Sequence, residues 1–137
     1  MSALAEWMLR ATGGSMALLA LLHVGFAKRF QWKEETARMS MLNQQIFYVH
    51  CFFICLVLLM MAALLGIWPH LLLEGGPLAR IVASGGAIFW FARLYIQWAY
   101  YDARLWRGKA FETMVHTIFT LLWCWYAVLF TWVAWHA

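Results

Sequence analysis

Charged residues are scarce in this sequence of 137 residues. Only 12% of them are Asp, Glu, Lys or Arg, whereas 66% are hydrophobic. A typical soluble domain carries about 25% charged and about 45–50% apolar residues. Only two prolines are present to interrupt the apolar runs. This composition excludes a soluble globular domain and predicts an integral membrane protein in contact with the lipid bilayer.

The few cysteines and the modest net charge exclude two further classes of protein. All three cysteines lie in or beside apolar runs rather than in turn-rich loops, which excludes a secreted disulfide scaffold. The formal net charge of +4 is the kind of excess that basic loops give to a membrane protein. We therefore expect no nucleic-acid partner.

Four long apolar segments occupy most of the chain. They cover about residues 8–27, 46–68, 81–101 and 110–135, and about 20 apolar residues suffice to cross a bilayer as a helix. Backbone groups must be paired inside lipid, and runs such as CLVLLMMAALLGI lack the alternating polarity of a β-barrel. The sequence predicts an all-α integral membrane protein, a four-transmembrane-helix up-down bundle that forms a single domain over residues 1–137.

Basic residues are distributed unevenly between the predicted loops. Seven lie in the first and third loops, and two lie on the other side of the membrane. Because cytoplasmic loops are rich in Lys and Arg, both termini are expected on the non-cytoplasmic side of a bacterial inner (cytoplasmic) membrane. The first loop, residues 28–45, has charges at helical spacing, which fits a short surface helix or a segment that docks a partner.

Tryptophan is abundant, with ten residues. Two of them, Trp123 and Trp125, lie deep in the fourth segment on different helix faces, so at least one is expected to face protein, a cofactor or a partner chain. Six others lie near the ends of predicted helices, where tryptophan forms interfacial belts; they are Trp7, Trp32, Trp68, Trp98, Trp106 and Trp135.

Glycine and proline mark close contacts and chain turns. The pairs Gly13–Gly14 and Gly85–Gly86 lie inside predicted helices, where small residues let two helices approach closely. Gly75–Gly76 precedes Pro77 and predicts a turn. Pro69 follows the second segment as a stop signal.

Ionisable and amide side chains gather at one depth of the predicted bundle. His23, His50 and His116 each lie about five residues inside the cytoplasmic end of a helix, or about 7–8 Å below that face. Gln97 lies at about the same level, and Arg93 lies about one turn deeper. Because ionisable groups inside a bilayer are costly and usually mark a site, we expect these five residues to bind a cofactor.

Three kinds of cofactor suit these residue types. Haem b would take two histidines from different helices as axial ligands, with Arg93 or a loop lysine neutralising a propionate. A transition metal, whether zinc, copper or iron, would take His23, His50 and His116, with Glu112 as a fourth ligand or as a base beside the metal. A quinone or another anionic amphiphile would accept hydrogen bonds from Arg93 and a histidine.

The same polar layer also has a purely structural interpretation. Polar side chains often hydrogen-bond between transmembrane helices without any ligand, each contributing around 0.6 kcal/mol. In that case Arg93 would pair with Glu112 or Asp102 and seal the bundle.

The layout of the chain resembles two groups of bacterial membrane proteins. Four short-looped helices, a histidine late in the first helix and a basic first loop are similar to the HemJ-type protoporphyrinogen oxidases and the copper-resistance CopD-like proteins. In HemJ-type proteins the first-helix histidine is associated with haem b, so the resemblance implies a haem ligand at His23. The family has a histidine-containing motif in its third helix, where this sequence reads RLYIQWAYYD around Arg93.

Two functions from different classes follow from the sequence. One is a small redox or cofactor-handling membrane protein that binds haem b, a transition metal or a quinone. The other is a non-catalytic accessory subunit of a larger respiratory or photosynthetic membrane complex. A homo-oligomer or such a complex would then be the protein partner, and the residues do not specify a reaction.

Overall fold

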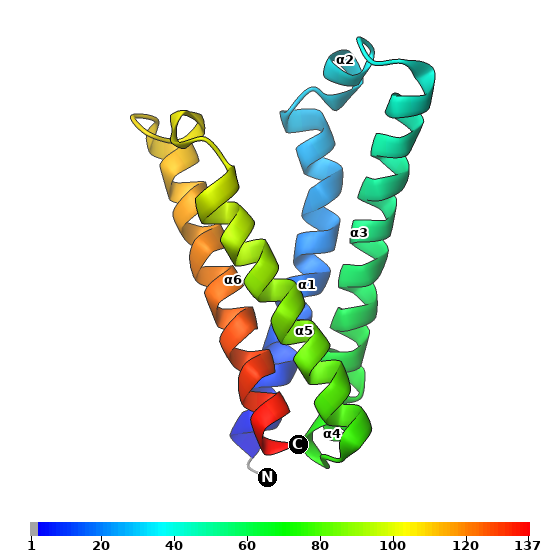
Figure 1. The fold of residues 1–137 in the computed structure, drawn as a ribbon, viewed down its shortest axis with the longest axis vertical. Helices are drawn as coiled ribbons and strands as arrows, with labels where there is room; N and C mark the ends of the chain where they lie inside the picture. Colours follow the sequence, from blue (N-terminus) through cyan, green and yellow to red (C-terminus); the bar gives the residue numbers. More distant parts are fainter. Residues whose placement is uncertain (1–2) are drawn as a thin grey trace. The chain divides into compact units, whose positions relative to one another are not determined.

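The computed structural model describes residues 3–137, and this part of the chain is helical with no strand (Figure 1). Three helices are long and apolar enough to cross a membrane: α1 (Ala3–Arg29), α3 (Met41–Ile67) and α6 (Ala110–His136). Each has 27 residues, or about 40 Å at 1.5 Å per residue, which exceeds the roughly 30 Å of a bilayer core. The prediction of an all-helical protein is therefore confirmed, and three of its helices have the length and composition that a membrane span requires.

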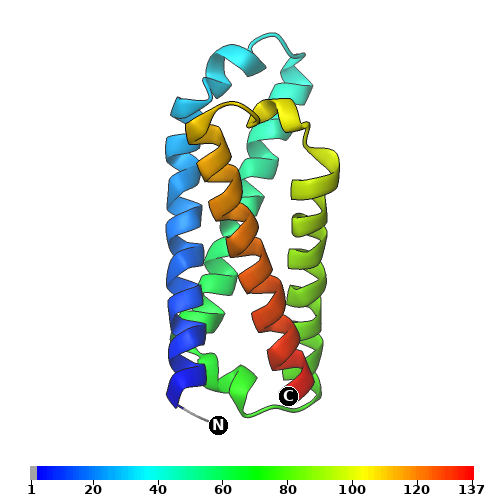
Figure 2. The same ribbon diagram turned by 90° about the vertical axis from the view of Figure 1, so that its left-hand side faces the viewer.

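The chain divides into two compact units. Unit 1 is Met1–Pro69 and unit 2 is His70–Ala137. Each contains one pair of long helices that run in opposite directions, as both views show (Figures 1 and 2). The prediction of a single domain over residues 1–137 stays a prediction.

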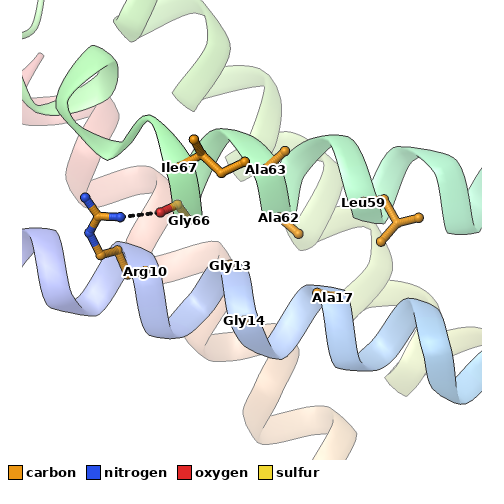
Figure 3. A pocket seen from close by; sticks show the side chains of 9 residues that line it. All are labelled: Arg10, Gly13, Gly14, Ala17, Leu59, Ala62, Ala63, Gly66 and Ile67. Atoms are coloured by element: carbon orange, nitrogen blue, oxygen red, sulfur yellow. Dashed lines mark hydrogen bonds between the residues drawn. The ribbon is translucent and has the colours of Figure 1, made fainter.

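In unit 1 the first helix begins earlier than the predicted residue 8. An arginine near the start of an apolar helix needs a partner, and two partners are present for Arg10. Its Nη2 atom lies 2.7 Å from Glu6 Oε1, four residues earlier in α1. Its Nη1 atom donates to the carbonyl oxygen of Gly66 in α3 (Figure 3). The charge is thus compensated within the helix pair, so α1 continues back to Ala3.

Only one residue of the first glycine pair mediates close packing. A Cβ atom added at Gly13 would lie 2.8 Å from Ala62 O and from Gly66 N, which are backbone atoms of α3. A Cβ atom added at Gly14 would have no heavy atom of the described residues within 4 Å. The predicted close approach of helices is confirmed at Gly13 and does not involve Gly14.

The first loop contains the predicted short helix, α2 (Trp32–Thr36). The Thr36 hydroxyl donates to Trp32 O at 2.6 Å and lies 3.3 Å from the Tyr48 hydroxyl, which ties the loop to α3. Ser40 then caps α3 by accepting from the Asn43 backbone N–H. A docking role for this loop stays a prediction.

The turn predicted around residues 75–77 is present. Gly75 and Gly76 have φ of +80° and +103°, values that glycine adopts without the steric cost of a Cβ atom. Pro77 then begins α5, which runs over Pro77–Tyr95. Before this turn, α3 ends at Ile67 as the stop signal predicted, and the short helix α4 (Pro69–Leu73) begins at the proline itself.

Unit 2 continues through two short irregular helices before α6. The π-helical turn η1 covers Ile96–Tyr100, and the 3-10 helix η2 covers Ala103–Leu105. α5 is not among the helices long and apolar enough to cross a membrane. Its 19 residues include two arginines, a serine and two glycines, so a fourth span is not established by length and composition.

The second glycine pair also divides its roles. A Cβ atom added at Gly86 would overlap the Phe130 ring of α6, whereas one added at Gly85 would meet no heavy atom of the described residues within 4 Å. Close packing of α5 on α6 is therefore centred on Gly86. About one turn after Gly86, Trp90 belongs to a buried aromatic cluster in which its ring stacks on that of Trp123, with centroids 5.1 Å apart.

Candidate functional site

Gln97 connects two of the predicted site residues through its side-chain amide. Arg93 Nη1 donates to Gln97 Oε1 at 3.1 Å, and Gln97 Nε2 lies 2.7 Å from His116 Nδ1. Only 6% of Gln97 is exposed, so water does not compete freely for this amide. We call Arg93, Gln97 and His116 the Gln97 network; three of the five predicted cofactor-binding residues meet there.

The network fixes which nitrogen of His116 carries a proton. A guanidinium can only donate hydrogen bonds, so the Gln97 oxygen must face Arg93. The amide NH₂ then faces His116 and can only donate, so Nδ1 must accept. In the neutral imidazole the proton therefore resides on Nε2, which becomes a donor.

The π-helical turn contains Gln97 and leads into the loop that covers His116. Such turns are rare and are frequent at functional sites. In the loop, the Trp106 ring stacks on the His116 imidazole with centroids 3.8 Å apart and planes 7° apart. The Thr113 hydroxyl holds this loop by donating to Trp106 O at 2.6 Å.

Arg93 rests on aromatic rings rather than on a carboxylate. Its Cζ atom lies 5.0 Å from the centroid of Trp123 and 5.6 Å from that of Tyr101, distances at which a cation interacts with a ring face. Asp102 pairs with Arg104 instead of Arg93. Hydrogen bonds from Arg104 hold the pKa of the Asp102 carboxyl below its usual value. The positive charge of Arg93 therefore has no pairing carboxylate among the described residues.

Three buried polar atoms near the network have no hydrogen-bond partner within residues 3–137. They are Trp90 Nε1, Trp123 Nε1 and Thr120 Oγ1. Thr120 is unusual for this chain, since the Thr117 and Thr131 hydroxyls each donate to the carbonyl four residues earlier. Buried polar groups normally have partners, and these three atoms have none among the described residues.

The other two predicted site histidines lie in unit 1 and have the opposite tautomer. His23 Nδ1 lies 2.8 Å from Leu19 O, and His50 Nδ1 lies 2.8 Å from Ile46 O. A carbonyl oxygen can only accept, so Nδ1 carries the proton and Nε2 keeps its lone pair. His136 contacts a carbonyl in the same way, so this tautomer alone does not distinguish a ligand.

The register of α1 against α3 sets the relative height of the two unit 1 histidines. Arg10 contacts Gly66, and the Cys55 thiol lies 3.8 Å from Ala20 O. These contacts bring His23 level with about residues 52–53 of α3. His50 is two or three residues further along, within about 5 Å of that level. His23 is half-buried and His50 is exposed.

The four predicted metal ligands are divided between the two units. His23 and His50 belong to unit 1, whereas His116 and Glu112 belong to unit 2. Within residues 3–137, no group of three or more His, Cys, Asp or Glu side chains is placed to hold a metal ion.

Unit 1 also has an open hollow of about 380 Å³ between α1 and α3. Its walls are apolar apart from Arg10, whose guanidinium already contacts Glu6 and Gly66. It therefore offers no free polar group for a ligand. Figure 3 shows its lining residues, which are Arg10, Gly13, Gly14, Ala17, Leu59, Ala62, Ala63, Gly66 and Ile67.

The sequence predicts that Trp123 or Trp125 faces protein, but it does not predict the contact that Trp106 makes. Its position near a helix end predicts an interfacial Trp106, but nothing in a loop sequence predicts a stack on a histidine of the next helix. Trp123 is 4% exposed and Trp125 is 42% exposed, so the expectation that at least one of them faces protein is confirmed.

No protein-family model matches this sequence, and no curated protein and no solved structure matches it. The function is therefore argued from the geometry of the residues described above.

Proposed function

We propose that this chain is a small integral membrane protein with a redox or cofactor-handling role, which binds haem b between His23 and His50. One observation carries the proposal. Both imidazoles use Nδ1–H on a backbone carbonyl, at 2.8 Å in each case, within about one turn of the same height in one helix pair. Histidines that bind a metal usually donate their other ring N–H to such a carbonyl or to a carboxylate.

The number of ligands favours haem over a single metal ion. Haem needs only axial ligands from the protein, and two histidines supply both. A zinc site needs three or four protein ligands. His116 does not add a third, because its Nε2 atom carries a proton as long as Arg93 orients Gln97. Lys28, five residues after His23, would neutralise a haem propionate.

The proposal includes four membrane spans with both termini outside the cytoplasm of a bacterial cell. α5 and η1 together cover Pro77–Tyr100, about 36 Å at 1.5 Å per residue. α5 packs along α6, with Gly86 against Phe130, so a bilayer around α6 also surrounds α5. The excess of basic residues in the first and third loops gives the orientation.

An accessory subunit of a larger respiratory or photosynthetic membrane complex is the second candidate. The observation that favours it is the Gln97 network, in which three polar side chains are linked by hydrogen bonds within unit 2. Such a layer needs no ligand to be stable. This candidate predicts that the protein copurifies with larger partners and carries no cofactor of its own.

The test is a visible spectrum of the protein purified in mild detergent from its native membrane, together with metal analysis. We expect a Soret band that shifts on reduction and about one iron per chain. His23→Ala and His50→Ala should each remove this band. His136→Ala is the matched control, because His136 has the same carbonyl contact at the end of α6. A folded, colourless and metal-free protein that runs with larger partners would contradict the haem proposal and support the second candidate.

A further inference from the structure

Hydrogen-bond donors without acceptors gather on the facing sides of α5 and α6. His116, Thr120 and Trp123 follow one another at helical spacing on α6, where positions three and four residues apart share a face. Trp90 and Arg93 lie one turn apart on α5. Trp90 and Trp123 are 2% and 4% exposed, and their indole N–H groups have no partner among the described residues. Such a place fits an electron-rich ligand atom.

The Gln97 network turns His116 into one of these donors. Arg93 orients the Gln97 amide, and the amide orients the imidazole, so Nε2–H points away from both partners. His116 is half-buried, so part of its side chain remains accessible. Trp106 covers one ring face at 3.8 Å and restricts the imidazole to a single plane.

The positive charge of Arg93 also favours an electron-rich ligand atom. Arg93 lies over Trp123 and Tyr101, donates from Nη1 to Gln97, and has no pairing carboxylate among the described residues. An unpaired cation in an apolar surrounding attracts a negative or strongly polar oxygen, since burying a charge without a partner is costly.

We propose that the Gln97 network is a binding site for an acceptor oxygen on a lipid-soluble molecule, with His116 Nε2–H donating the positioning hydrogen bond and Arg93 supplying the charge. The carbonyl of a long-chain quinone and the carboxylate of a fatty acid both provide this oxygen. All residues of the site lie in unit 2, so the site does not depend on the haem proposed for His23 and His50.

Two variants test the role of the His116 Nε2–H donor while keeping hydrogen bonds within the network. In His116→Asn, the side-chain oxygen can still accept from Gln97, but the Nε2–H donor is gone. In Gln97→Glu, the carboxylate accepts from Arg93 and from His116, so the imidazole proton moves to Nδ1 and the charge is neutralised. His136→Asn is the matched control on the same helix, since His136 also has an Nδ1 contact and packs on an indole ring.

The experiment titrates the full-length protein in neutral detergent micelles with a decyl-chain ubiquinone analogue or with oleate. Binding is followed by the NMR resonance of the Trp106 indole N–H, which is assigned by Trp106→Phe. We expect a saturable shift, with an affinity about tenfold lower in His116→Asn and in Gln97→Glu, and unchanged in His136→Asn. Circular dichroism confirms that each variant is folded.

The two probes distinguish the source of the oxygen. Saturation by the quinone with little salt dependence identifies a carbonyl ligand. Saturation by oleate that weakens with salt identifies a carboxylate ligand. Absence of saturation by either probe would overturn the proposal, as would equal affinity in the wild type and in both folded variants. Loss of haem in His50→Ala with an unchanged titration would show that the haem site and this site are separate.

Discussion

Gly13 and Gly14 are adjacent in α1, yet the same substitution should affect them very differently. In Gly13→Ala the new Cβ atom would lie 2.8 Å from two backbone atoms of α3, whereas ordinary van der Waals contact begins at 3.4 Å. The clash partners are Ala62 O and Gly66 N, which cannot rotate away as a side chain can. The helices must therefore separate locally by about 0.6 Å, which also stretches the hydrogen bond from Arg10 to Gly66.

The difference in stability between Gly13→Ala and Gly14→Ala measures the cost of this clash. Both residues lie in the middle of α1, so both alanine substitutions gain the same helix propensity, up to about 1 kcal/mol. Overpacking a close interface costs about 1–3 kcal/mol. Gly13→Ala should therefore be less stable than Gly14→Ala by about 1–3 kcal/mol, and Gly14→Ala should match or exceed the wild type.

Chemical unfolding of the purified protein in detergent, followed by tryptophan fluorescence, measures both free energies of unfolding. The slope with denaturant must be the same for the two variants if the comparison is to report stability. Equal stability of Gly13→Ala and Gly14→Ala would refute the packing of α1 on α3 described above.

Three further predictions concern unit 2. Gly86→Ala should lower the free energy of unfolding relative to Gly85→Ala, but by less than at Gly13, because a ring can turn aside; the same denaturation measures it. Gln97→Leu should destabilise the protein by about 1–3 kcal/mol, since it removes the hydrogen-bond partner of two half-buried polar side chains, Arg93 and His116, and thermal unfolding checks this. Arg104→Gln should raise the pKa of Asp102, because the hydrogen bonds that lower it are lost. Since the Asp102 pKa is lowered in the folded protein, its small contribution to stability is present above the ordinary carboxyl pKa. It is lost as the pH falls through the folded value, and an NMR titration of the carboxyl carbon measures the change.

The sequence predicted the helices better than the contacts of the polar side chains. Apolar runs define helices because lipid leaves the backbone no alternative, so most predicted bounds differ from the observed ones by a few residues. The first helix begins earlier than predicted, because Arg10 suggested an interface and its compensation by Glu6 and Gly66 depends on tertiary structure. Depth along a helix correctly grouped Gln97 with His116.

Orientation around each helix axis and the division into units were harder to predict. The segment between η1 and α6, residues 101–109, brings Trp106 onto His116, and no periodicity encodes such a contact. The tautomers were also inaccessible, because they depend on which partner each ring nitrogen meets. His116 differs from the unit 1 histidines only because Gln97 reaches it from another helix.

Nitrogen NMR of the histidine side chains tests the central claim most directly. The claim is that His23 and His50 keep free Nε2 lone pairs suited to iron, whereas His116 presents Nε2–H as a donor. In the cofactor-free protein, at a pH where the imidazoles are neutral, the account predicts protonated Nδ1 in His23 and His50 and protonated Nε2 in His116. Protonated Nε2 in His23 or His50, or protonated Nδ1 in His116, would contradict it.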